Sequence, residues 1–305
     1  MIISSILPTF TMIALGSLLK RLGLIDHAFL KTSDKIVYFI FFPALLFWKI
    51  GTPSGDGGTE HWSMIGAVLC AVSCVAVLSV VYAYAARVPR FYVGSFSQAS
   101  FRFSTYVGIA VVLGAYGEEG VRQFGVVIGF VIPIINVMCV TILIWFSERN
   151  YSSRDRYRLV VQAMWSNPLI WACVAGVVYS RLNVGFPAFL DRTLALMSSI
   201  AVPLALLSIG ASLTFGQLRG NLRQAAVSQA LKLVLMPLIG YCLLRVWGIT
   251  GLEFQVAMVY FALPTSPATY ILSSQLDSDL DLASASIVLS TLLSTVSLAI
   301  TLALV

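Results

Sequence analysis

Residues Leu263–Tyr270 read LPTSPATY, with two prolines and three short hydroxyl side chains in the middle of a long apolar run. A proline lacks a backbone N–H donor and clashes with the preceding turn, so Pro264 and Pro267 predict that a helix stops here. Within a lipid bilayer, interrupted backbone is tolerated only where it packs in protein or lines a watery cavity. The segment is therefore a candidate binding site.

The composition around this segment is that of an integral membrane protein. Of the 305 residues, 59% are hydrophobic and only 10% are charged, which is more apolar surface than a soluble core of this size could hide. The apolar runs are about 20 residues long, which suits helices that cross a hydrocarbon core of ~30 Å and does not suit barrel strands of ~10 residues. We expect an all-α membrane fold.

The charges exclude several classes of function. The net charge of +6 comes from Lys and Arg residues in short loops, without a basic block, so no nucleic acid partner is expected. The five cysteines lie in apolar runs without ligand spacing, so we expect neither a disulfide nor a metal site. No Asp, Glu or His lies deep in an apolar run, which argues against an enzyme. No cofactor is expected, and coupling to protons or sodium is left open.

Ten apolar runs are candidate spans, roughly 2–20, 34–51, 62–86, 91–116, 121–146, 166–183, 192–214, 224–247, 253–276 and 282–305. The odd-numbered connections hold most of the Lys and Arg residues. Because positive charge is kept on the cytoplasmic side, this bias predicts that both termini are extracytoplasmic. The last odd-numbered connection does not follow this pattern, because it carries Asp277, Asp279 and Asp281 and no basic residue. Acidic residues contribute little to orientation.

The two halves of the chain share residues at a fixed spacing. Five residues recur 160 positions later, as Pro8, Gly16, Arg21, Leu22 and Pro43 match Pro168, Gly176, Arg181, Leu182 and Pro203. We expect a first five-helix repeat at 1–146, a cytoplasmic linker at 147–165 and a second repeat at 166–305. Five is an odd number, so the second repeat is inverted in the membrane, as in many secondary transporters.

The repeat pairs the Leu263–Tyr270 segment with a segment of the fourth span. Thr105-Tyr106 recurs as Thr269-Tyr270 at a spacing of 164, and Ser104, Thr105 and Gly108 are weak helix formers. Arg102 lies about twelve residues into this span, or ~18 Å along a helix, where a cation is costly and calls for a partner or a watery cavity. If both spans break and cross, the amino-terminal helix ends meet and favour an anion such as a carboxylate.

Two further polar residues lie among apolar neighbours, Asn136 in the fifth span and Lys232 in the eighth. The predicted substrate-binding residues are Arg102, Ser104, Thr105, Tyr106, Asn136, Lys232, Thr265, Ser266, Thr269 and Tyr270. The predicted helix-breaking residues are Gly108, Pro264 and Pro267. Structural alternatives stay open at this point, because the cations could snorkel, the hydroxyls could bond their own helices and the tyrosines could serve packing.

The order and spacing of several short motifs resemble the auxin efflux carrier family, including its bacterial members and the plant PIN carriers, and cover nearly the whole chain. The motifs are Leu7-Pro8, Ala14-Leu15-Gly16, Arg21-Leu22-Gly23-Leu24, Phe42-Pro43-Ala44-Leu45-Leu46, Ser100-Phe101-Arg102, Asn167-Pro168-Leu169-Ile170, the run Pro203–Leu213, and Leu231-Lys232-Leu233 with Pro237. The same fold is shared with the bile-acid sodium symporters.

The resemblance implies ten transmembrane helices in two inverted repeats, with broken helices 4 and 9 that cross at the substrate site. It implies a scaffold of helices 1, 2, 6 and 7, a transport domain of helices 3–5 and 8–10, an elevator-type movement and a homodimer in the lipid bilayer. Family substrates are organic anions. The long central loop of the plant carriers is absent, which favours a bacterial type in the inner membrane.

One departure from the family concerns the crossover itself, where its members usually carry an asparagine in each broken helix. This chain has Ser104 in the first and Ala268 in the second. We expect a secondary transporter for a small organic anion, a mono- or dicarboxylate. The alternatives are a sodium-coupled symporter of the bile-acid type and a membrane receptor or partner subunit without transport.

Overall fold

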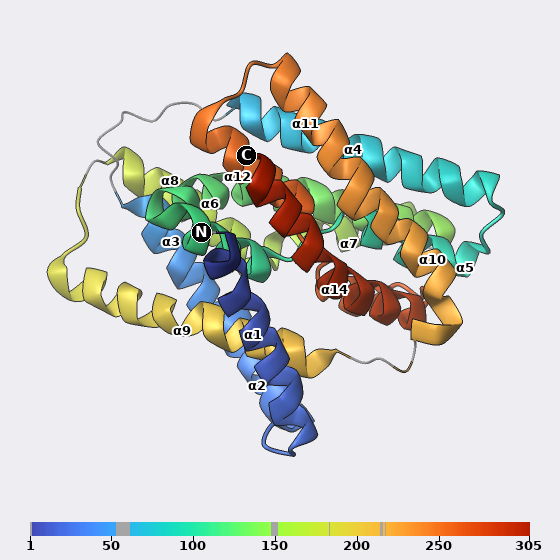
Figure 1. Ribbon diagram of the computed structural model, residues 1–305, viewed down its shortest axis with the longest axis horizontal. Helices are drawn as coiled ribbons and strands as arrows, with labels where there is room; N and C mark the ends of the chain where they lie inside the picture. The colour runs from blue at the N-terminus through green and yellow to red at the C-terminus, as the bar shows by residue number, and fades with distance from the viewer. Residues whose placement is uncertain (1, 53–61, 148–151, 183, 214–215, 217) are drawn as a thin grey trace. The chain divides into compact units, whose positions relative to one another are not determined.

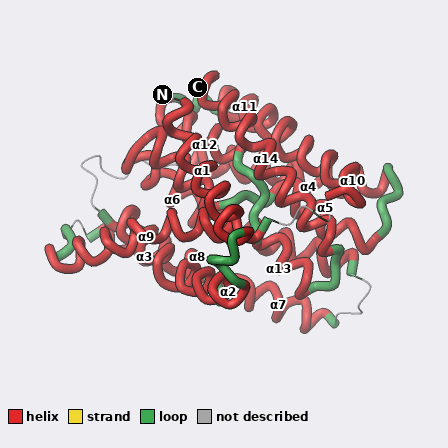
Figure 2. The backbone as a smooth tube through the Cα atoms, turned by 60° about the horizontal axis from the view of Figure 1, so that its bottom comes forward, coloured by secondary structure: helices red, strands yellow, loops and turns green. Residues whose placement is uncertain are grey.

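The computed structural model describes residues 2–52, 62–147, 152–182, 184–213, 216 and 218–305, and these form helices joined by loops, without a strand (Figures 1 and 2). The helices of the first half are α1 Ile2–Arg21, α2 His27–Ile36, η1 Val37–Phe41, α3 Phe42–Gly51, α4 Trp62–Ala85, α5 Arg90–Phe101 and α6 Thr105–Phe146. Those that follow are α7 Ser153–Trp165, α8 Pro168–Arg181, α9 Ala188–Ser212, α10 Leu218–Ala230, η2 Leu231–Leu235, α11 Met236–Val246, α12 Gly251–Ala262, α13 Ala268–Gln275 and α14 Leu280–Leu304.

Five helical stretches of the described chain are long and apolar enough to cross a membrane, namely Trp62–Ala85, Arg90–Phe146, Ala188–Ser212, Gly220–Val246 and Leu280–Leu304. Pro168–Arg181 and Gly251–Ala262 are shorter apolar helices. The all-helical membrane fold expected from the composition is confirmed at this level. The arrangement as ten helices in inverted repeats stays a prediction.

The chain divides into two compact units. Unit 1 comprises Met1–Trp62, Tyr106–Phe130 and Asn167–Ser212, and unit 2 comprises Ser63–Thr105, Val131–Ser166 and Leu213–Val305. Each unit therefore draws residues from both predicted halves of the sequence. The predicted repeats and the predicted scaffold and transport domains are not tested by this division.

Unit 1 is built on two helix pairs, α1 with α9 and α3 with α8. In both pairs a glycine lets the backbones approach closely. A Cβ on Gly16 of α1 would collide with the backbone of Leu207 in α9, and one on Gly176 of α8 would meet Ile50 and the Phe47 carbonyl of α3. Small residues at such contacts are how membrane helices gain van der Waals packing. The contacts Gly16–Leu207 and Gly176–Phe47 are also related by the spacing of 160 that relates the two halves.

Unit 2 is organised around α14, which packs against α10, α5, α12 and α13. Its buried face is rich in small residues, including Ala285, Ser286, Ser290 and Ser294. Small side chains let the neighbouring helices come close, and their hydroxyls bond back to the helix itself, as Ser290 does to the Ile287 carbonyl at 2.9 Å. The polar groups of unit 2 are therefore held by tightly packed helices.

Prolines explain the two π-helical turns of the described chain. In η2 the amide of Met236 donates to the Leu231 carbonyl five residues back, directly before Pro237. Pro237 has no N–H, so it cannot serve the Leu233 carbonyl, and the hydroxyl of Ser297 in α14 donates to that oxygen at 3.2 Å. In η1 the amide of Phe42 likewise bonds to Val37, directly before Pro43. The wider turn relieves the clash between a proline ring and the preceding turn.

Two sequence expectations change in the structure. The predicted linker at 147–165 is largely helical, because Ser153–Trp165 forms α7. The predicted connection between the fourth and fifth spans is reduced to one residue with left-handed backbone, Gly117 with φ 65°, inside the long helix α6. Only glycine adopts this conformation without steric cost, so a kink here needs no longer loop.

Candidate functional site

The first interruption of a helix in unit 2 lies between α5 and α6. Helix α5 ends at Phe101, Arg102 is extended with φ −67° and ψ 150°, and Ser104 is also extended before α6 begins. The predicted break in the fourth span is therefore present at Arg102–Ser104. Gly108 was expected to contribute to it, but this is wrong, because Gly108 lies within the first turns of α6. A glycine in a helix costs only ~1 kcal/mol, which tertiary packing can offset.

The second interruption lies between α12, which ends at Ala262, and α13, which begins at Ala268. Leu263 is extended with ψ 147°, as expected for a residue that precedes a proline. Pro264 lies inside the interruption and Pro267 directly precedes α13, where its fixed φ of −56° suits a helix start. The Leu263–Tyr270 segment therefore does break a helix, as its prolines predict.

The two interruptions are hydrogen bonded to each other. The Ser104 amide donates to the Pro264 carbonyl at 2.8 Å. The hydroxyl of Thr265 donates to the Ala99 carbonyl at 2.8 Å, and the Thr265 amide donates to the hydroxyl of Ser290 at 3.1 Å. The backbone groups released by the broken helices are thus partly satisfied by one another, as the absence of water in a bilayer requires.

Arg102 is the half-buried cation beside these breaks. Its guanidinium donates to the Gln98 side-chain carbonyl at 3.4 Å and to that of Asn136 at 3.3 Å, and it interacts with the Cys139 thiol. In the part of the chain that the structure describes, no carboxylate pairs with it. Its partners are uncharged, so an anion would gain the full charge-assisted hydrogen bond from this guanidinium.

Gln98 ties Arg102 to the second break. Its side-chain carbonyl accepts from Arg102, while its amide nitrogen donates to the Thr269 carbonyl at 3.2 Å and to the Ser273 hydroxyl at 2.7 Å. Because the Gln98 side chain bonds Arg102 through its oxygen and α13 through its nitrogen, a displacement of Arg102 would also disturb the hydrogen bonds to α13. The network therefore couples the cation to the Leu263–Tyr270 segment.

The hydroxyls of the two breaks fall into two groups. Thr265 is occupied by its bond to Ala99, and the hydroxyl of Ser266 accepts the Ala268 amide at 3.2 Å as a local cap. Among the described residues, the buried hydroxyl oxygens of Ser104 and Thr269 have no hydrogen-bond partner. An unpaired buried hydroxyl costs about 1–3 kcal/mol, so these two groups are the ones available to a ligand.

Lys232 is completely buried in η2. Its ammonium nitrogen lies 3.3 Å from the Met236 sulfur and 5.7 Å from the ring centroid of Tyr260. A thioether is a weak acceptor, so neither neighbour balances a full charge. The snorkelling alternative does not describe this side chain, which has no exposed surface in unit 2.

The remaining predicted residues are Thr105, Tyr106 and Tyr270. Tyr106 belongs to unit 1, where its ring packs 4.4 Å from that of Phe42. Tyr270 follows Thr269 but is 43% exposed. Thr105 is the first residue of α6, and its side chain is half-buried. The second copy of the Thr-Tyr pair therefore supplies a buried Thr269 hydroxyl without a partner among the described residues, and an exposed Tyr270 ring.

Sequence reasoning missed Tyr260. This tyrosine of α12 is fully buried, its ring packs 4.4 Å from that of Phe103 in the first break, and it faces Lys232. Its hydroxyl oxygen has no hydrogen-bond partner within the described chain. The available signal was a phenolic group in an apolar run four residues before Pro264, which is one helical turn from the break.

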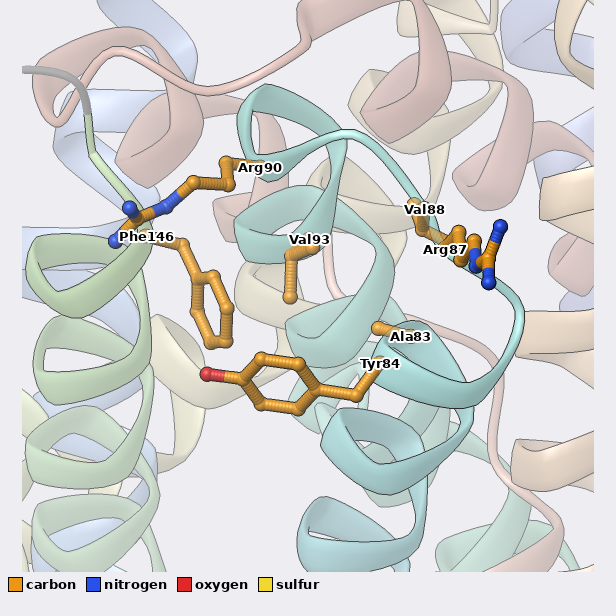
Figure 3. A pocket seen from close by; sticks show the side chains of 7 residues that line it. All are labelled: Ala83, Tyr84, Arg87, Val88, Arg90, Val93 and Phe146. Atoms are coloured by element: carbon orange, nitrogen blue, oxygen red, sulfur yellow. The ribbon is translucent and has the colours of Figure 1, made fainter.

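A pocket of about 250 Å³ lies elsewhere in unit 2, where the α4–α5 loop meets the end of α6. It is lined by Ala83, Tyr84, Arg87, Val88, Arg90, Val93 and Phe146. Figure 3 shows the Tyr84 and Phe146 rings near each other, and the Arg87 and Arg90 side chains on opposite sides. The Arg90 guanidinium is engaged with the Trp145 carbonyl at 3.3 Å. None of the predicted site residues lines this pocket.

A family model described as membrane transport protein matches residues 1–302. The chain belongs to this family. The resemblance to the auxin efflux carriers is thereby confirmed, and the protein is a membrane transporter and not an enzyme.

Relatives match the membrane transporter along almost its whole length. It is 27% identical to an uncharacterised transporter from Methanothermobacter thermautotrophicus, over 96% of this chain and 95% of the relative. It is 23% identical to one from Methanocaldococcus jannaschii, over 97% and 96%. A protein from Rhizobium meliloti, provisionally named a malonate transporter, is 25% identical over 95% of this chain and 91% of its own length.

Proposed function

We propose that this transporter is a secondary carrier for a small organic anion, a mono- or dicarboxylate, which binds beside the two helix breaks of unit 2. The observation that carries the proposal is the environment of Arg102, whose guanidinium pairs only with uncharged groups among the described residues. The unpartnered hydroxyls of Ser104 and Thr269 lie in the same two breaks. A guanidinium and hydroxyl donors are the groups that recognise a carboxylate.

The relatives support the same class of substrate. A relative that aligns along nearly the full length carries a malonate transporter's name, and malonate is a small dicarboxylate. The family usually has an asparagine at the positions of Ser104 and Ala268. The side chains that contact the substrate here would therefore differ from the family pattern. We therefore assign the class of substrate and not the individual acid.

An elevator-type movement belongs to the proposal and is supported by the division of the chain into two compact units. Unit 1 holds the helices of predicted spans 1, 2, 6 and 7, which would form the scaffold, together with Tyr106–Phe130. The inverted repeat is supported by the paired contacts Gly16–Leu207 and Gly176–Phe47. We also propose a homodimer in a bacterial inner membrane, with both termini extracytoplasmic.

The test is Arg102→Gln, which removes the charge and keeps a hydrogen-bonding side chain. In proteoliposomes, uptake of labelled malonate should fall at least tenfold, because a charge-assisted hydrogen bond contributes about 1.5–3 kcal/mol. Arg87→Gln is the matched control, since Arg87 is exposed on the α4–α5 loop. Undiminished uptake by the folded Arg102 variant would overturn the assignment of this residue.

A further inference from the structure

The polar groups of unit 2 extend beyond the two breaks into a fully enclosed region around Tyr260. The Tyr260 ring packs against that of Phe103, the residue after Arg102, and the Lys232 ammonium lies 5.7 Å from the Tyr260 ring centroid. The Arg102 guanidinium also interacts with the Cys139 thiol. Phe103, which follows Arg102 in the chain, and Tyr260 therefore lie between the half-buried Arg102 and the fully buried Lys232 in this series of neighbours.

Two hydrogen-bond donors in this region are unmatched. The Tyr260 hydroxyl has no partner among the residues that the structure describes, and Lys232 has only the thioether of Met236. A neutral hydroxyl left unpaired costs about 1–3 kcal/mol, and an unbalanced buried charge costs more. Such groups persist in native structures where a ligand or a function requires them.

The surrounding helices offer no counter-charge. The segment η2 packs against α5, α10, α11, α12 and α14, whose acidic residues are Glu253 and Asp281, both in the first turn of their helix. Neither forms an ion pair with Lys232 within the described part of unit 2. Tyr260 is the titratable group that faces the ammonium. An anion that enters the site would supply the counter-charge that Lys232 lacks among these residues.

We propose that Tyr260 and Lys232 form an anion subsite that takes a carboxylate group of the transported acid, with the Tyr260 hydroxyl as donor and the Lys232 ammonium as counter-charge. The subsite rests on the proposed function and adds Tyr260 to the binding residues. The anion reaches it from Arg102, because Arg102 is only half-buried while Tyr260 and Lys232 are enclosed. The ligand shares its carboxylate between the subsite and Arg102, or spans them with two.

The test separates binding from folding by measuring both on the purified full chain. Tyr260→Phe removes only the hydroxyl, so the midpoint of thermal unfolding without ligand should stay the same or rise. The dissociation constant for labelled malonate should rise about 10- to 100-fold, since a donor to a charged acceptor is lost. Lys232→Met replaces the ammonium with an apolar side chain like that of the neighbouring Met236. It should also leave the unfolding midpoint unchanged or higher and raise the dissociation constant.

Tyr241→Phe is the control, because Tyr241 lies on α11 of the same unit with 42% of its surface exposed. This variant should change neither measurement. The double variant of Tyr260 and Lys232 should weaken binding by less than the product of the single effects, because both groups would hold the same carboxylate.

The outcomes distinguish the subsite from the proposed function. If wild-type protein binds malonate and Arg102→Gln loses it, but Tyr260→Phe binds as wild type does, the subsite is wrong and the function stands. A lower unfolding midpoint of Tyr260→Phe with unchanged affinity gives the hydroxyl a structural role and also overturns the subsite. Displacement of malonate by sulfate, but by neither acetate nor a second dicarboxylate such as succinate, would contradict a carboxylate ligand. If wild type binds neither malonate nor acetate, both proposals fall.

Discussion

At the scale of the residue, two threonines of one short segment have opposite roles. Thr265 and Thr269 are both buried and lie four positions apart, yet Thr265 donates to the Ala99 carbonyl while the Thr269 hydroxyl has no partner in the described chain. Helix α5 ends at Phe101, so the Ala99 carbonyl is one of the orphan acceptors at a helix end. Thr265 therefore stabilises the fold, while Thr269 is available to the substrate.

The pair gives a prediction in which each threonine is the other's control. Thr265→Val should lower the free energy of unfolding by about 1–3 kcal/mol, because the Ala99 carbonyl loses its donor. Thr269→Val should leave stability unchanged or raise it, and should weaken malonate binding. Thermal unfolding of both variants without ligand, followed by binding measurements, tests the contrast. Equal losses of stability would show that the Thr269 hydroxyl stabilises the fold as much as the Thr265 hydroxyl does, and would contradict this contrast.

At the scale of the element, prolines occur both at the break between α12 and α13 and at the π-helical turns. Pro264 and Pro267 stop a helix, whereas Pro237 only widens a turn. The difference lies in how the orphaned carbonyl is satisfied. The Leu233 carbonyl, which Pro237 cannot serve, accepts from Ser297 of α14, so the helix continues across the proline. A single neighbouring hydroxyl is enough to keep η2 and α11 in one helical path.

Ser297→Ala should therefore destabilise unit 2 by about 1 kcal/mol, the scale of a hydrogen bond between membrane helices. The effect should shrink in a Pro237→Ala background, because alanine returns an N–H donor to the Leu233 carbonyl. A double-mutant cycle on unfolding free energies measures this coupling. Strict additivity of the two substitutions would contradict the explanation.

At the scale of the whole molecule, orientation follows from where the positive charge lies. The odd-numbered connections hold most Lys and Arg residues of the loops, which predicts that the α4–α5 loop is cytoplasmic and the α11–α12 loop is extracytoplasmic. If the protein alternates between two conformations, this orientation would determine which of them opens to the cytoplasm.

The orientation can be tested with single cysteines in a variant whose five native cysteines are replaced by serine. Thr250→Cys, between α11 and α12, should react with a membrane-impermeant maleimide on intact cells. Ala86→Cys, between α4 and α5, should react only after the membrane is made permeable. Both positions are exposed, so accessibility should depend on the side of the membrane. The reverse pattern would invert the topology.

The sequence by itself determined the helical membrane class, because 59% hydrophobic residues in runs of membrane length admit few other solutions. It also located both helix breaks. Proline chemistry is local and placed the break at Pro264–Pro267, and the Thr-Tyr repeat with the weak helix formers Ser104 and Thr105 placed the other. Gly108 was placed wrongly because weak propensity, unlike a missing N–H, yields to packing.

Only the tertiary structure decided which side chains share one environment. Thr265 and Thr269 are indistinguishable in sequence, and their difference depends on the Ala99 carbonyl from a helix more than 160 residues away. Tyr260 is grouped with the first break by its contact with Phe103, and it also faces Lys232. Hydrogen-bond satisfaction is a property of neighbours in space, so a polar residue in an apolar run marks a need for a partner without showing whether the protein supplies one.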